Sequence, residues 1–92
     1  MKVKKNYLLR QVMGKWVVVA VGSDSVRFRG MITLNHSGAS LWRVLQKECA
    51  FEELVTTLTD AYEVTEEEAR QDVLAFLNTI QESGCLEGWK QG

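Results

Sequence analysis

The chain has 92 residues, of which 46% are hydrophobic, and its formal net charge is −1, which suits one compact domain with a single core. The two cysteines, Cys49 and Cys85, lie too far apart for a zinc or redox pair, so we expect reduced, partly buried thiols and a cytoplasmic protein. The basic first residues precede an apolar stretch that is broken by Arg10, Gln11 and Lys15, which excludes a secretory signal and a membrane span.

Charge is distributed unevenly along the chain. Residues 1–47 contain nine Lys or Arg and one acid, whereas residues 48–92 contain eleven acids and two basic residues. Two interpretations remain open. Either a basic sheet and acidic helices attract one another or solvate their own faces, or a basic sheet edge favours an acidic peptide.

Three strands are predicted first. Residues 8–13 and 16–21 are rich in strand-forming side chains, and residues 14–15 connect them as a tight hairpin. Residues 22–25 supply the next turn, because glycine tolerates positive φ and the Ser and Asp side chains bond to nearby backbone. Alternating apolar and polar side chains predict a third strand over about residues 26–34.

Three helices follow the strands. Asn35 ends the third strand and caps the first helix, because its side chain can accept a hydrogen bond from a backbone N–H two or three residues further on. Thr65 and Glu68 form a capping box at the start of the third helix, and Gly84 ends that helix. The three helices carry apolar stripes, which contain in turn Gly38, Leu41, Trp42 and Leu45; Phe51, Leu54, Val55, Leu58 and Tyr62; and Ala69, Val73, Phe76, Leu77 and Ile80.

Three strands followed by three helices predict an α+β fold, a three-stranded antiparallel sheet packed by three α-helices in a winged helix-turn-helix-like arrangement. We expect a single domain over residues 1–92 with an ordered core from about residue 7 to residue 87. DNA binding has to be weighed for such a fold, because only a few residues connect the second and third helices. The third helix carries Arg70 alone among several acids, which argues against a nucleic-acid partner.

Catalysis finds no support in the sequence. His36 is the only histidine, and no Ser, Cys and acid constellation surrounds it. Neither a glycine-rich phosphate loop nor a dinucleotide fingerprint is present. We therefore expect a non-enzyme with no cofactor, metal or catalytic site.

The combined spacing of several motifs resembles the PqqD family. These motifs are Leu34-Asn35-x-x-Gly38-x-x-Leu41-Trp42, then Glu53-Leu54-Val55 and Leu58, then Asp72-Val73-x-x-Phe76-Leu77, and finally Gly84-x-Leu86. The resemblance covers about residues 17–86. It implies a RiPP recognition element, a peptide chaperone that presents the leader of a ribosomal precursor peptide to a modifying enzyme, commonly a radical SAM protein.

In that family the leader adds as an extra strand beside the third strand and lies in the groove between this strand and the third helix. Carried onto this sequence, the resemblance implies two sets of peptide-binding residues. On the strand they are Arg27, Phe28, Arg29, Gly30, Met31, Ile32 and Thr33, and on the helix Asp72, Val73, Phe76, Leu77 and Ile80.

Each of these positions also has a plain structural explanation. The apolar helix residues form a stripe that is equally typical of a core, and Gly30 either admits a close-packed helix or marks a bulge. The Asp72 carboxylate has three possible partners: an arginine of the third strand, a basic residue of the leader, or solvent. Trp42 is predicted to be a core anchor of the first helix.

The sequence departs from the members of the family that serve pyrroloquinoline quinone (PQQ) synthesis. It lacks their Cys-Asp-Gly segment after the first helix and contains no proline. The pathway therefore stays open between PQQ and another RiPP. We expect no membrane partner and a monomer or weak homodimer; a small structural subunit of a larger complex is a further alternative.

Overall fold

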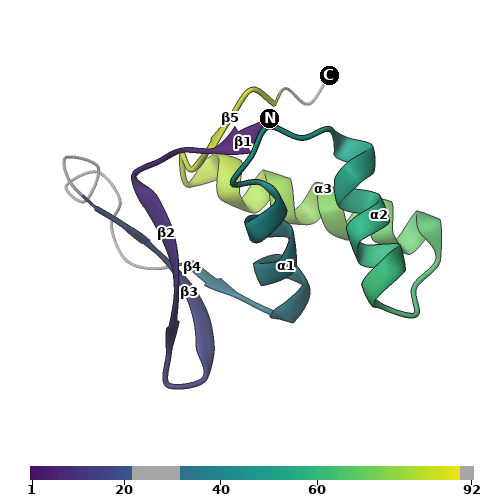
Figure 1. Ribbon diagram of the computed structural model, residues 1–92, viewed down its shortest axis with the longest axis horizontal. Coiled ribbons are helices and arrows are strands. Elements are labelled where there is room, and N and C mark those ends of the chain that lie inside the picture. The colour runs from purple at the N-terminus through teal and green to yellow at the C-terminus, as the bar shows by residue number, and fades with distance from the viewer. Residues whose placement is uncertain (22–31, 90–92) are drawn as a thin grey trace.

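The computed structural model describes residues 1–21 and 32–89. This part of the chain forms two small antiparallel sheets and three helices (Figure 1). In chain order the elements are β1 (Lys2–Val3), β2 (Tyr7–Val12), β3 (Lys15–Ala20), β4 (Ile32–Leu34), α1 (His36–Val44), α2 (Phe51–Ala61), α3 (Glu66–Glu82) and β5 (Leu86–Glu87). The larger sheet has the strand order β2-β3-β4, and β1 pairs with β5. The predicted α+β class, with a three-stranded antiparallel sheet followed by three helices, is confirmed.

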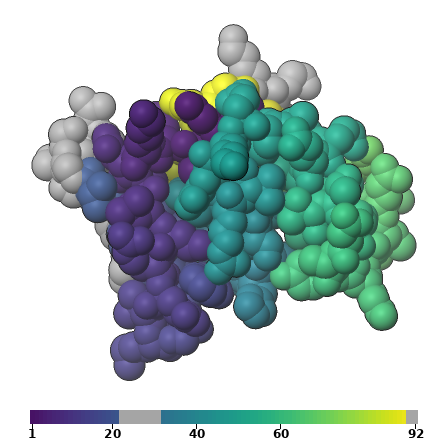
Figure 2. Space-filling model, in the orientation of Figure 1, coloured from purple at the N-terminus to yellow at the C-terminus, as the bar shows by residue number. Residues whose placement is uncertain are grey.

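The β2–β3 hairpin turns one residue earlier than predicted. Its register runs from Tyr7 opposite Ala20 to Val12 opposite Lys15, so Met13 and Gly14 form the turn. Both have positive φ, 51° and 80°. Type I′ turns need positive φ at both central residues, and their twist matches the twist of the two strands. The prediction of a turn at residues 14–15 is therefore wrong. The β2–β3 hairpin projects from the body of the molecule (Figure 2).

β4 is the described end of the predicted third strand. Residues 22–31 lie outside the described residues, and with them the predicted turn at residues 22–25 and the first part of the predicted strand. In β4, Ile32 and Leu34 are half-buried and buried while Thr33 is exposed, as the alternating pattern predicts. β4 pairs with β3 in antiparallel register, with Thr33 opposite Val17.

Side-chain caps define the starts of α1 and α3, as predicted. Asn35 Oδ1 accepts a hydrogen bond from the Gly38 N–H at 2.8 Å, so α1 begins directly after β4. The Thr65 hydroxyl accepts from the Glu68 N–H at 3.1 Å, and Glu68 Oε1 accepts from the Thr65 hydroxyl at 3.0 Å. Gly84, with φ of 80°, follows the end of α3. Because one residue connects β4 to α1, the cap fixes the angle between the sheet and the helices.

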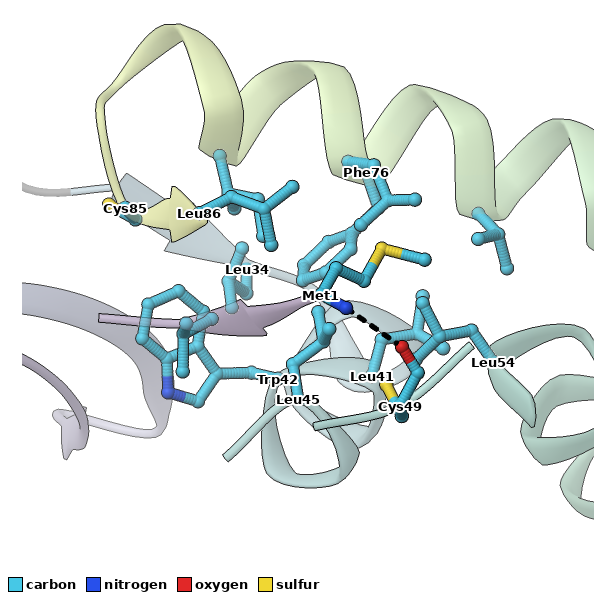
Figure 3. Close-up of a cluster of buried hydrophobic side chains, with 14 of the residues drawn as sticks. Met1, Leu34, Leu41, Trp42, Leu45, Cys49, Leu54, Phe76, Cys85 and Leu86 are labelled. Carbon is cyan, nitrogen blue, oxygen red and sulfur yellow. Dashed lines mark hydrogen bonds between the residues drawn. The ribbon is translucent and has the colours of Figure 1, made fainter. Parts of the chain in front are cut away.

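Met1 and Val3 belong to the hydrophobic core, although the sequence predicts an ordered core only from about residue 7. β1 pairs with β5, Lys2 opposite Glu87 and Val3 opposite Leu86. The Met1 ammonium donates to the Cys49 carbonyl oxygen at 3.1 Å, and Met1 and Val3 are buried (Figure 3). No alternating sequence pattern predicts the two-residue strands β1 and β5, because each pairs with a partner that is distant in the sequence.

One hydrophobic cluster joins the sheet to all three helices (Figure 3). Trp42 is the largest of its fully buried side chains, which confirms its predicted role as a core anchor. Arg43, the next residue, stacks over the ring of Trp16 with its guanidinium carbon 4.6 Å from the ring centroid. α1 is thus held to the core on one face and to β3 on another.

Both cysteines are free, buried thiols. Burial raises the pKa of Cys85 from 9.0 to about 11, and burial followed by the charge of Glu53 raises the pKa of Cys49. The raised pKa keeps the Cys85 thiol protonated in the folded protein. The contribution of this protonated thiol to the free energy of unfolding is complete below about pH 9 and is lost as the pH rises through about 11. Since the thiolate is the reactive form, both thiols should react slowly in the folded protein.

Alkylation checks this expectation. At pH near 8, iodoacetamide should modify Cys49 and Cys85 at least about tenfold more slowly in the folded protein than in urea, because folding removes both access and thiolate. Mass spectrometry of digested samples gives the rate at each cysteine. Equal rates in the folded and unfolded chains would contradict the buried, protonated state of both thiols.

Candidate functional site

β4 forms one edge of the larger sheet. β3 pairs with β4 on one side, and no described strand pairs with β4 on the other. The backbone groups of an edge strand that face away from the sheet are available to a further strand. Residues at the end of β4 and residues of α3 border a common groove.

A groove of about 410 Å³ runs between β4 and α3, and the first turns of α1 form its floor. Its lining comes from Thr33, Leu34 and Asn35 at the end of β4, from Ser37, Gly38 and Leu41 of α1, and from Asp72, Ala75, Phe76 and Thr79 of α3. The groove is therefore bounded by one edge of the larger sheet and by two helices, α1 and α3.

The α3 residues of the groove form one helical stripe. Asp72, Ala75, Phe76 and Thr79 are spaced i, i+3, i+4 and i+7, so they lie on one face of the helix. Ala75 and Thr79 are exposed, whereas Phe76 is buried to 9% exposure and still borders the groove. The exposed side chains of this stripe, Ala75 and Thr79, are small and take up little of the groove.

Gly38 allows α1 to pack closely at the floor of the groove. A Cβ atom on this residue would lie 3.1 Å from Asn35 Oδ1, 3.3 Å from Leu34 Cβ and 3.5 Å from Phe76 Cδ1. The first two distances are shorter than ordinary contacts, so a larger residue would push against the oxygen that caps α1 and against β4. Glycine at this position keeps β4, α1 and α3 close together.

The structure brings together only part of the predicted peptide-binding set. Thr33, Asp72 and Phe76 line the groove. Ile32 is half-buried and packs against the core beside it. Five further predicted residues, Arg27, Phe28, Arg29, Gly30 and Met31, lie outside the described residues.

Three of the predicted α3 residues belong to the core. Val73, Leu77 and Ile80 have no exposed surface and pack in the hydrophobic cluster. They lie on the face of α3 that packs into the molecule, so a peptide in the groove could not touch them. We assign them to the core rather than to the groove.

Sequence reasoning missed seven of the groove residues. These are Leu34, Asn35, Ser37, Gly38, Leu41, Ala75 and Thr79. The helical spacing of Asp72, Ala75 and Thr79 was a usable signal, because it marks a stripe next to the apolar one. Asn35, Gly38 and Leu41 were recognised as a cap and as packing residues, and the structure adds that the same residues border the groove.

The charges near the groove leave one carboxylate without a partner among the described residues. Arg70 donates to both carboxylate oxygens of Glu52, each at 2.7 Å, and to Glu66 Oε1 at 2.9 Å. These hydrogen bonds raise the pKa of Arg70 above its ordinary value and keep its charge away from Asp72. Asp72, in contrast, is exposed and makes no hydrogen bond or ion pair with a described residue.

The groove offers groups for holding an extended chain. Backbone groups at the edge of β4 can pair with a further strand, Phe76 supplies apolar surface, and Asp72 supplies negative charge. Within the described residues, no group of three or more His, Cys, Asp or Glu side chains could hold a metal ion. None of the described helices is long and apolar enough to cross a membrane.

A winged-helix-like α+β domain with an open sheet edge beside a groove is thus the class that the fold and the site define. The model of a known family, Coenzyme PQQ synthesis protein D (PqqD), matches residues 15–86. This match spans most of the chain, so the chain belongs to the PqqD family, the RiPP recognition element family.

Two solved structures share the fold. The first is described as TbiB1 in complex with the TbiA(beta) leader peptide; it has a TM-score of 0.79 and 20% sequence identity over 99% of this chain and 100% of that chain. The second is described as lasso peptide synthetase B1 complexed with the leader peptide, with a TM-score of 0.71 and 20% identity over 91% of this chain and 93% of that chain. A comparison with curated proteins found no match.

Proposed function

We propose that this protein is a non-catalytic chaperone that binds the leader of a ribosomal precursor peptide in the groove between β4 and α3. The observation that carries the proposal is the open edge of β4 directly beside the groove. A peptide that adds to a sheet edge gains backbone hydrogen bonds whatever its sequence, and pockets under alternate side chains supply the specificity. The groove residues of α1 and α3 provide such pockets.

Family membership and the two similar structures support this proposal. The chain belongs to the RiPP recognition element family. Both similar structures are described as complexes with a leader peptide. A role in presenting a peptide explains why an open edge and groove are retained in so small a domain.

The charges of α3 favour a peptide over DNA. In a winged helix that binds DNA, a recognition helix brings basic side chains to phosphates and base edges. The one basic residue of α3, Arg70, is held by Glu52 and Glu66. The first turn of α3 carries Glu66, Glu67 and Glu68, which would repel a DNA duplex.

The proposal extends to the partners of the complex. The bound peptide is the leader of a precursor, and the receiving enzyme is a radical SAM protein or another peptide-modifying enzyme of a PQQ or other RiPP pathway. We propose that the chaperone works in the cytoplasm as a monomer or weak homodimer. Genes for a short precursor and a radical SAM enzyme beside this gene would support that assignment.

An NMR titration with the precursor peptide encoded beside the gene tests the function. Amide signals of Thr33, Ala75 and Thr79 should shift, because a strand added to β4 changes the surroundings of both walls of the groove. Signals of Met13 and Gly14, at the far hairpin turn, serve as the internal control. If peptides from all neighbouring short genes leave the groove signals in place, the proposed function is wrong.

A further inference from the structure

A second hollow adjoins the groove at the Asp72 end. It has a volume of about 260 Å³ and shares Asn35, Ser37 and Asp72 with the groove. It lies where α1 begins and α2 ends, and Figure 1 shows these two helix ends on the same side of the molecule. A chain that leaves the groove past the end of β4 therefore enters this hollow directly.

One wall of the hollow is apolar. Leu58, almost fully buried at 1% exposure, forms its base together with the half-buried Tyr62 and Val64. The three side chains come from the end of α2 and from the connection to α3. A volume of about 260 Å³ is below the roughly 300–1,000 Å³ of sites that enclose whole small molecules. The hollow is therefore suited to a single side chain.

The rim of the hollow carries an unpaired negative charge. Within residues 1–21 and 32–89, the Asp72 carboxylate and the Tyr62 hydroxyl have no hydrogen-bond partner. Arg70, two residues before Asp72, is taken up by its two glutamates. Asn35, His36 and Ser37 line the same hollow. Asn35 Oδ1 already accepts from the Gly38 N–H and the Ser37 hydroxyl, and the His36 side chain has no hydrogen-bond partner among the described residues.

The apolar wall and the carboxylate at the rim together determine which kind of side chain can occupy the hollow. A lysine or arginine has a long apolar stem that can lie along Leu58 and Val64, and a cationic head that can stop at the rim. The head would meet the Asp72 carboxylate and the face or hydroxyl of Tyr62. A purely apolar side chain would fill the base but cover Asp72 without a partner, which costs free energy.

We infer that this hollow is a subsite that takes one lysine or arginine side chain of the bound peptide, with Asp72 as the residue that selects positive charge. The inference rests on the proposed function, since the β4 edge delivers the peptide to the hollow. Asn35, which borders both spaces, directly follows the last residue of β4. The basic residue therefore lies just outside the segment that pairs with β4, and it fixes the register of that segment.

A selection experiment with a displayed library of random short peptides tests the inference. The full chain should enrich peptides that carry lysine or arginine at one fixed position next to an extended segment. The D72N variant should still enrich extended peptides but lose the preference for a basic residue. E82Q is the matched control, because Glu82 is an exposed carboxylate on the same helix, away from both hollows.

Affinities of one enriched peptide make the test quantitative. Replacing its basic residue by alanine should weaken binding to the full chain and to E82Q by about fivefold, the upper range of exposed ion pairs, and leave binding to D72N nearly unchanged. Replacing it by glutamate should weaken binding to the full chain further, and D72K should restore that affinity. Circular dichroism melts show that each variant is folded.

The possible outcomes separate the two proposals. If the full chain enriches extended peptides without a basic position, or if D72N keeps the basic preference, the subsite is wrong while the groove function stands. If groove-filling substitutions leave all selected peptides bound, the groove function itself is wrong and the subsite falls with it. Loss of the basic preference in D72N alone supports both.

Discussion

Replacing Ala75 by tryptophan is expected to lower the affinity for the leader peptide by at least about tenfold, because the indole would occupy the space that the added strand needs. Ala75 is exposed and lines the groove between its neighbours Asp72 and Thr79 on the α3 stripe. Losing only two backbone hydrogen bonds at about 0.5–1.5 kcal/mol each already corresponds to roughly a tenfold change. Isothermal titration calorimetry with the precursor peptide measures the loss.

Leu74→Trp is the matched control for this experiment. Leu74 is the neighbouring residue, is also exposed, and does not line the groove. The control variant should bind with the affinity of the unchanged chain, and both variants should keep its melting temperature. A folded Ala75→Trp variant that binds as tightly as the control would show that the peptide does not use this groove.

Replacing Trp42 by alanine is expected to lower the free energy of unfolding by about 3–5 kcal/mol, the usual loss for a buried tryptophan. Trp42 is fully buried and is the largest side chain of the core. Domains of this size commonly have only about 5–15 kcal/mol of stability in total, so this loss is a large share of the whole. Urea denaturation followed by circular dichroism measures the difference.

Trp42→Phe should cost less than half as much. The phenyl ring fills much of the same space, and the substitution also removes the buried indole N–H, which has no hydrogen-bond partner among the described residues. Trp16→Ala is the control, because Trp16 is only half-buried against β4 and Arg43. If Phe and Ala at position 42 destabilise equally, the cost comes from lost indole contacts and not from the volume of the cavity.

Local signals in the sequence were enough to locate most of the helices and strands. Asn35 and Thr65 cap α1 and α3 through their own side chains, so the starts of these helices depend on neighbouring residues alone. The turn of the β2–β3 hairpin lies one residue earlier than predicted, at Met13 and Gly14. The strand-forming side chains are compatible with both turn positions, and the positive φ of Met13 distinguishes them. The β1–β5 pair depends on contacts between the two ends of the chain, which no local pattern reveals.

The candidate site was predicted less completely than the fold. The spacing of Val73, Phe76, Leu77 and Ile80 indicates an apolar face of α3, and only the structure shows that Val73, Leu77 and Ile80 are fully buried while Phe76 reaches the groove. Ala75 was not predicted, because small side chains give no hydrophobic signal. Its importance comes from the space that it leaves next to β4.

The sequence by itself therefore determined the order of the elements, their caps, the buried face of each helix and the resemblance to the PqqD family. All of these follow from interactions between residues that are close in the chain or from the spacing of motifs. The tertiary structure decided which edge of which strand stays open, which side of α3 faces it, and that Asp72 stands between the groove and a second hollow. These features depend on how distant elements pack against one another, because a side chain is exposed or buried only with respect to its neighbours in space.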